Sequence, residues 1–112
     1  MQISIDQQNH VTVVAVAGSL DALTADLLTT ALQEQVRAGN TKLVASLAAL
    51  DYTSSAGLRV LLGTLKDARR GGGDLRLAGA QERVQRVLEL SGFTSILKCY
   101  PDVPSAVASF AS

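Results

Sequence analysis

The chain has 112 residues, and its ten Lys and Arg balance its ten Asp and Glu, so the formal net charge at pH 7 is zero. This length fits one domain, and the balanced charge argues against a nucleic acid or an anionic membrane as partner. The composition is 47% hydrophobic and 18% charged, which excludes a disordered tail, and no apolar run reaches the ~20 residues of a membrane span.

The first half of the chain alternates between strand and helix patterns. Residues 2–6 alternate between apolar and polar, and residues 11–17 are apolar on both faces, so we expect two strands joined by a tight turn, the second ending at Gly18. After Gly18, apolar residues spaced three and four apart predict a helix that Asp21 or Thr24 caps. A buried strand over 42–47 is expected to follow it. The buried stripe expected for this helix is Leu23, Leu27, Leu28, Ala31, Leu32 and Val36.

The second half repeats this alternation. Leucines at helical spacing predict a helix over about 55–70, which ends at a run of three glycines. Residues 74–79 alternate as a strand, Val84, Val87 and Leu88 mark a short helix, and residues 95–99 are expected to form the last strand. Asp102 and Pro104 open a final helix.

The order of these elements predicts the fold class. The first two strands pair antiparallel, whereas each later strand follows a helix, which favours parallel crossovers. We therefore expect a single α/β domain over residues 1–112, with one mixed sheet of about five strands and about four helices.

Groups that carry enzyme chemistry are scarce. His10 is the only histidine and lies in an expected turn, and Cys99 is the only cysteine, so neither a catalytic base nor a metal-ligand set is evident. We expect no catalytic residue, no metal and no cofactor. The single cysteine and the absence of a leader segment favour the cytoplasm, and the few aromatic residues favour a monomer.

The segment LDYTSSAGLR, residues 50–59, is the most informative part of the chain. It connects a buried strand to an apolar-striped helix, and it places Ser54 and Ser55 where that helix begins. A serine there can cap the helix, which contributes about 1 kcal/mol. The free amides and the dipole of the same helix end can also accommodate a phosphate. The two interpretations are compatible.

Two motifs resemble those of STAS domains. Gly18-Ser19-Leu20-Asp21 is similar to the G-x-L-D segment of that family, and residues 50–62 are similar to the strand-to-helix segment of its anti-sigma-factor antagonists. The resemblance covers essentially the whole chain and implies a STAS-like fold. The family's phosphoacceptor serine falls on Ser55, and Ser54 is a rival because it replaces an acidic residue of the sporulation-type relatives.

The resemblance also implies a mechanism. Such antagonists bind an anti-sigma factor that is also a serine kinase of the histidine-kinase-like ATPase fold, and phosphorylation of the antagonist ends binding until a serine phosphatase reverses it. Arg59 stands where those relatives have Gly, and it can pair with Asp21, pair with the phosphate, or face solvent. The partner-binding residues implied are Asp21, Thr53, Ser54, Ser55, Ala56, Gly57, Leu58 and Arg59.

Two alternatives remain open at the level of sequence. The chain can be a STAS interaction module of a transport or signalling complex that is never phosphorylated, with Ser55 acting only as a helix cap. It can also be a small enzyme or nucleotide-binding protein, for which the sequence offers no convergent polar groups.

Overall fold

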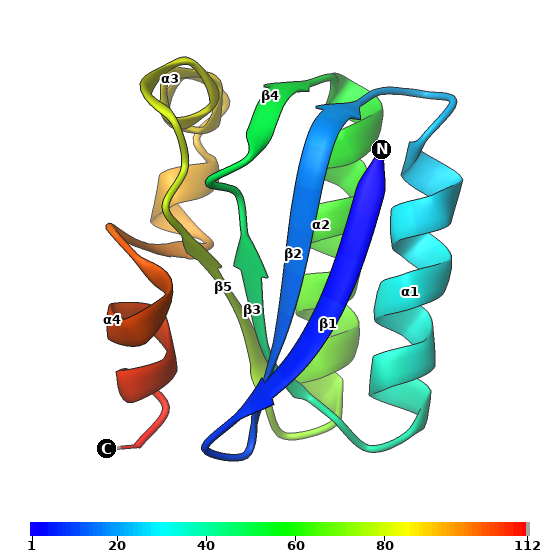
Figure 1. Ribbon diagram of the computed structural model, residues 1–112, viewed down its shortest axis with the longest axis vertical. Helices are drawn as coiled ribbons and strands as arrows, with labels where there is room; N and C mark the ends of the chain where they lie inside the picture. Colours follow the sequence, from blue (N-terminus) through cyan, green and yellow to red (C-terminus); the bar gives the residue numbers. More distant parts are fainter. Residues whose placement is uncertain (112) are drawn as a thin grey trace.

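A mixed β-sheet forms the centre of the computed structural model, which describes residues 1–111 (Figure 1). The β1–β2 pair is antiparallel and every other strand pair is parallel, so the predicted fold class is confirmed. The sheet runs in the order β1-β2-β3-β5-β6, and β4 pairs with β2 outside this path. The strands are β1 (Gln2–Gln8), β2 (Val11–Leu20), β3 (Lys42–Ser46), β4 (Leu50–Thr53), β5 (Asp74–Ala78) and β6 (Lys98–Tyr100).

The helices cover the two faces of the sheet unequally. Figure 1 shows α1 and α2 side by side along one face, with α4 on the other side of the sheet, far from β1. Within residues 1–111, no helix combines the length and the apolar character needed to cross a membrane. The helices are α1 (Ala25–Arg37), α2 (Ser55–Arg70), α3 (Glu82–Leu90), a 3-10 turn η1 (Phe93–Ser95) and α4 (Val103–Ala108).

The core is aliphatic, as the scarcity of aromatic residues predicts. One cluster lies between the sheet and helices α1, α2 and α3, and includes Val14, Leu28 and Leu61, all at most 1% exposed. A smaller cluster lies between the sheet and α4, and includes Val44 and Val107. Burial of each such side chain contributes roughly 1.5–3 kcal/mol to the free energy of folding, so the two clusters hold the helices firmly against the sheet.

The sheet has one strand more than the sequence predicted. Residues 50–53 were expected to be a connection, but they form β4, which pairs with residues 18–20 of β2. The prediction that Gly18 ends the second strand was wrong, because β2 continues to Leu20. Gly18 has a φ of +100°, and the pairing register shifts between Gly18 and Ser19. A bulge at a glycine thus redirects β2 toward β4.

Two further expectations need correction. Leu23 is 89% exposed and Leu27 is 56% exposed, although both belong to the predicted buried stripe. Leu23 precedes α1, and Leu27 lies outside the buried face that Ala25, Leu28 and Leu32 form. The strand expected over residues 95–99 is shorter and later, because η1 occupies its beginning and β6 starts at Lys98. The final helix begins as expected, since Asp102 accepts a hydrogen bond from the Ser105 N–H at 2.8 Å.

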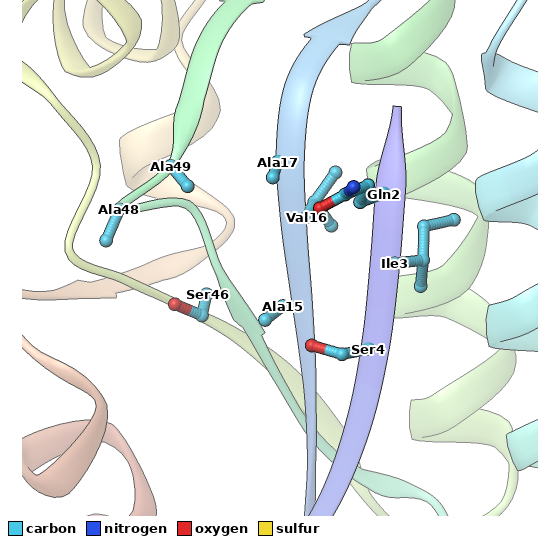
Figure 2. A pocket seen from close by; sticks show the side chains of 9 residues that line it. All are labelled: Gln2, Ile3, Ser4, Ala15, Val16, Ala17, Ser46, Ala48 and Ala49. Carbon is cyan, nitrogen blue, oxygen red and sulfur yellow. The ribbon is translucent and has the colours of Figure 1, made fainter.

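Part of the face opposite α1 and α2 remains open. Small side chains from β1, β2 and the segment after β3 line a shallow groove of about 570 Å³ there. Figure 2 shows Ser4 and Ala15 at this groove, and it shows the side chain of Ile3, which also lines the groove, directed toward the α1 side of the sheet. The alternation along β1 therefore sends Ile3 toward the side of the sheet that α1 covers, where it packs against the larger core cluster.

Candidate protein-interaction site at the start of α2

The site lies where β2 and β4 end side by side. Leu20 and Thr53 are register partners in this parallel pair, and the Ser54 N–H donates to the Leu20 carbonyl oxygen at 2.8 Å. Asp21 follows the first strand directly, and Ser55 begins α2 after the second. The two candidate residues therefore follow the carboxyl ends of two paired strands.

The two serines have different environments. Ser55 is the first residue of α2 and is exposed. Ser54 is the N-cap residue, with extended backbone angles (φ −99°, ψ 177°), but its side chain makes no capping hydrogen bond. Its Oγ is buried and has no hydrogen-bond partner within the described residues. The expected capping by a serine hydroxyl is therefore absent, and Ser55 is the hydroxyl that solvent or another protein can reach.

Asp21 is held in place by the turn that leads into α1. One of its carboxylate oxygens accepts hydrogen bonds from the Leu23 N–H at 3.0 Å and the Thr24 N–H at 3.1 Å. The Asp21 N–H in turn donates to Thr24 Oγ1 at 2.9 Å, which completes a reciprocal capping box. The Thr24 amide, together with the Thr24 hydroxyl and the Leu23 amide, holds the pKa of Asp21 below its usual value.

We predict a pH-dependent contribution of Asp21 to stability. Because its pKa is lowered on folding, the charged carboxylate stabilises the protein above the unfolded-state pKa, and this contribution is lost as the pH falls through the folded-state pKa. Thermal unfolding of the wild type and of Asp21→Asn from about pH 6 to about pH 2.5 tests this. The wild type should melt higher at the upper end, and the gap should close at the lower end. A gap that is constant with pH would contradict the prediction.

Three of the predicted partner-binding residues are buried. Thr53 is 5% and Leu58 is 8% exposed, and Gly57 is also buried. A Cβ on Gly57 would lie 2.5 Å from Thr53 Oγ1 and 2.6 Å from Leu20 Cγ, so α2 approaches β2 and β4 as closely as only glycine permits. These three residues support the site from beneath and offer no side chain to a partner.

The exposed part of the predicted set is smaller. Ser55 and Arg59 are exposed, and Ala56 is half-buried. No salt bridge joins Arg59 to Asp21 within residues 1–111, so of the three roles considered for Arg59 the structure shows a solvent-facing side chain. Sequence reasoning also missed Tyr52 on β4, which is 51% exposed. An aromatic residue directly before a candidate phosphoacceptor segment was the available signal.

The described residues contain no group of three or more His, Cys, Asp or Glu side chains placed to hold a metal ion. Cys99 is half-buried, and burial, with a smaller effect from Glu89, raises the pKa of its thiol. A raised pKa keeps the thiol protonated and weakly nucleophilic at neutral pH.

The site at the start of α2 combines the Ser55 hydroxyl, the Asp21 carboxylate and the free amides of the helix end. These groups suit recognition by another protein and covalent modification.

Comparison with known proteins identifies the family. The STAS domain family matches residues 2–106. The chain is a STAS domain. It is 34% identical, over 98% of its own length and 95% of the relative's, to BtrV of Bordetella bronchiseptica, a proposed anti-sigma factor antagonist. It is 29% identical to an anti-sigma F factor antagonist of Paenibacillus polymyxa, over 96% of this STAS domain and 92% of the relative.

Solved structures agree with the fold of this STAS domain. An anti-sigma factor antagonist from Mycobacterium paratuberculosis superposes with a TM-score of 0.91, at 24% identity, over 99% of this chain and 94% of that one. This superposition shows that the two chains share the fold.

Proposed function

We propose that residues 1–112 form one STAS domain that acts in the cytoplasm as an anti-sigma-factor antagonist. Ser112, at the end of this range, lies outside the described residues. The domain binds an anti-sigma factor that is also a serine kinase of the histidine-kinase-like ATPase fold, and phosphorylation of Ser55 ends that binding. It works by binding rather than by catalysis. The family, the names of the relatives and the environment of Ser55 support this proposal.

The observation that carries the proposal is the contrast between the two serines. The Ser55 side chain stands exposed at the first position of a 16-residue helix, and the Ser54 Oγ is buried under it. The kinase transfers the γ-phosphoryl group of ATP to Ser55 Oγ: the Oγ–P bond forms, the bond to the leaving ADP breaks, and a base of the kinase takes the hydroxyl proton. A phosphatase then hydrolyses the Oγ–P bond with water.

The start of α2 tolerates the new charge. A phosphate adds about −1.5 to −2 charges, and the amides and the positive dipole end of a helix stabilise an anion there. Asp21 follows β2 at the same end of the β2–β4 pair, so phosphorylation adds negative charge to a surface that already carries this carboxylate. We infer that phosphorylation changes the recognition surface and leaves the fold intact.

The phosphorylation site is predicted to be Ser55. Incubation with the cognate kinase and ATP should add one phosphoryl group to the wild type and none to Ser55→Ala, as measured by intact mass spectrometry. Ser54→Ala is the matched control, because it removes a buried hydroxyl that has no partner, and it should be phosphorylated as the wild type is.

Modification that persists in Ser55→Ala and disappears in Ser54→Ala would move the site to Ser54. Absence of modification in the wild type, together with stable binding to a transporter or another signalling protein, would favour a STAS interaction module that is not phosphorylated.

A further inference from the structure

The β1 edge of the sheet is open. β1 pairs with β2 on one side only, and it ends the strand order of the sheet. It is one of the two longest strands, with seven residues in continuous register from Gln2↔Ala17 to Gln8↔Val11. Among the described residues no other strand pairs with its outer side.

The hairpin geometry decides which backbone groups this edge exposes. Asn9 and His10 both have positive φ, 51° and 67°, and form a two-residue turn closed by the Gln8↔Val11 pair. Hydrogen-bonded and non-hydrogen-bonded residue pairs alternate along the hairpin, starting from the hydrogen-bonded pair at Gln8. The even-numbered residues of β1 therefore exchange backbone hydrogen bonds with β2. The N–H and C=O groups of Ile3, Ile5 and Gln7 therefore point outward.

This edge lacks the features that usually protect one. β1 contains no Pro, no Lys and no bulge, Asp6 is its only charged residue, and the side chain of Ile5 is 43% exposed. The opposite edge of the sheet is different, because β6 has only three residues and its first is the exposed Lys98. A long, unprotected edge strand can pair with another strand. At high protein concentration the most available partner is β1 of a second copy of this chain.

We propose that this protein self-associates through antiparallel pairing of β1 with β1 of a second copy, about a two-fold axis at Ile5. In this register Ile5 faces Ile5 of the second copy, and Ile3 faces Gln7 of the second copy, so every outward backbone group finds a partner. Asp6 faces Ser4 of the second copy, and the two carboxylates do not meet. The edge is complementary to itself.

The exposed side of α1 extends this contact. Gln33, Val36 and Arg37 line a groove together with Asp67 of α2, so that side of α1 faces α2. Leu27 lies about 180° around the helix from Val36, since nine residues at 3.6 per turn complete two and a half turns. It therefore faces away from α2, and it is 56% exposed. In the proposed dimer we expect the two Leu27 side chains to lie beside the joined strands.

The contact is small and reversible. Edge pairing of short strands falls below the ~1,200 Å² of a standard interface, which is typical of weak association. Pairing of the β1 edges leaves the Ser55 end of α2 free. The proposed self-association therefore goes beyond the proposed function, and either can hold or fail without the other. It also departs from the monomer predicted from composition, because composition does not reveal an unpaired strand edge.

Sedimentation equilibrium from about 10 μM to about 1 mM tests the proposal. The weight-average mass of the wild type should rise from 11.7 kDa toward twice that value. Ile5→Pro removes an outward N–H without breaking the ladder to β2, and Ile5→Lys places a charge at the axis; both should stay at 11.7 kDa. Leu27→Lys should also lose the dimer.

Leu90→Lys is the matched control, since Leu90 is 83% exposed on α3, far from this edge, and this variant should self-associate as the wild type does. Circular dichroism checks folding, and if Ile5→Pro does not fold, Ile5→Lys still decides the outcome. A wild type that stays monomeric at about 1 mM, or Ile5→Lys that still dimerises, overturns the proposal. Loss of the dimer in Leu90→Lys alone would place the contact on α3 and overturn it as well.

Discussion

Phosphorylation of Ser55 is expected to weaken binding to the kinase partner about a thousandfold. Ser55 is exposed at the start of α2, beside Asp21 and above the buried Thr53, Gly57 and Leu58. A partner that covers this position must desolvate about two negative charges, or the contact must be abandoned. An unpaired buried charge costs about 2–5 kcal/mol, and a value near 4 kcal/mol corresponds to three orders of magnitude in affinity.

The Ser55→Asp variant separates binding from folding. An acidic residue in the first turn of a helix interacts favourably with the helix dipole, so the free variant should melt at the same temperature as the wild type or higher. Its affinity for the partner should nevertheless fall steeply, as measured by titration calorimetry. Thr94→Asp, which adds the same charge at an exposed position of η1, should bind as the wild type does. Tight binding by both Ser55→Asp and the phosphorylated protein would rule out a phosphorylation switch at this site.

Replacement of Gly57 by Ala is expected to destabilise the protein by about 1–2 kcal/mol. The new Cβ would meet Thr53 Oγ1 at 2.5 Å and Leu20 Cγ at 2.6 Å, and Leu20 is fully buried. Overpacking of this kind costs about 1–3 kcal/mol, while Ala regains up to about 1 kcal/mol because it is a better helix former than Gly. The net loss should lower the midpoint of thermal unfolding by roughly 5–10 °C.

Gly63 offers a matched control on the same helix. A Cβ at Gly63 would meet nothing within 4 Å, so Gly63→Ala should raise stability by about 0.5–1 kcal/mol. Gly57→Ala should also lift the start of α2 and slow phosphorylation of Ser55, whereas Gly63→Ala should not. Equal melting temperatures for the two variants would show that the close approach of α2 to Leu20 contributes little.

The site could be predicted in part from the sequence. Asp21 or Thr24 was expected to cap α1; Thr24 is the N-cap residue but its side chain makes no capping hydrogen bond, whereas Asp21 accepts from the Leu23 and Thr24 amides in the turn before the helix. The capping expected from a serine at α2 was wrong, because Ser54 Oγ is buried and makes no capping hydrogen bond. Two adjacent hydroxyl residues look alike in sequence, and only the packing of α2 against β2 and β4 distinguishes them.

Hydrophobic periodicity and glycine placement determined the α/β class, the alternation of strands and helices and the aliphatic core, because these patterns reflect local geometry along the chain. The pairing of β4 with β2, the exposure of Leu27 and the open β1 edge depended on which segments become neighbours in space. The hydrophobic period of a helix or strand shows which of its sides is apolar. It does not show how much of that side the facing layer of the structure covers. For that reason the tertiary structure alone showed that Ser55 faces outward while Ser54 Oγ is buried.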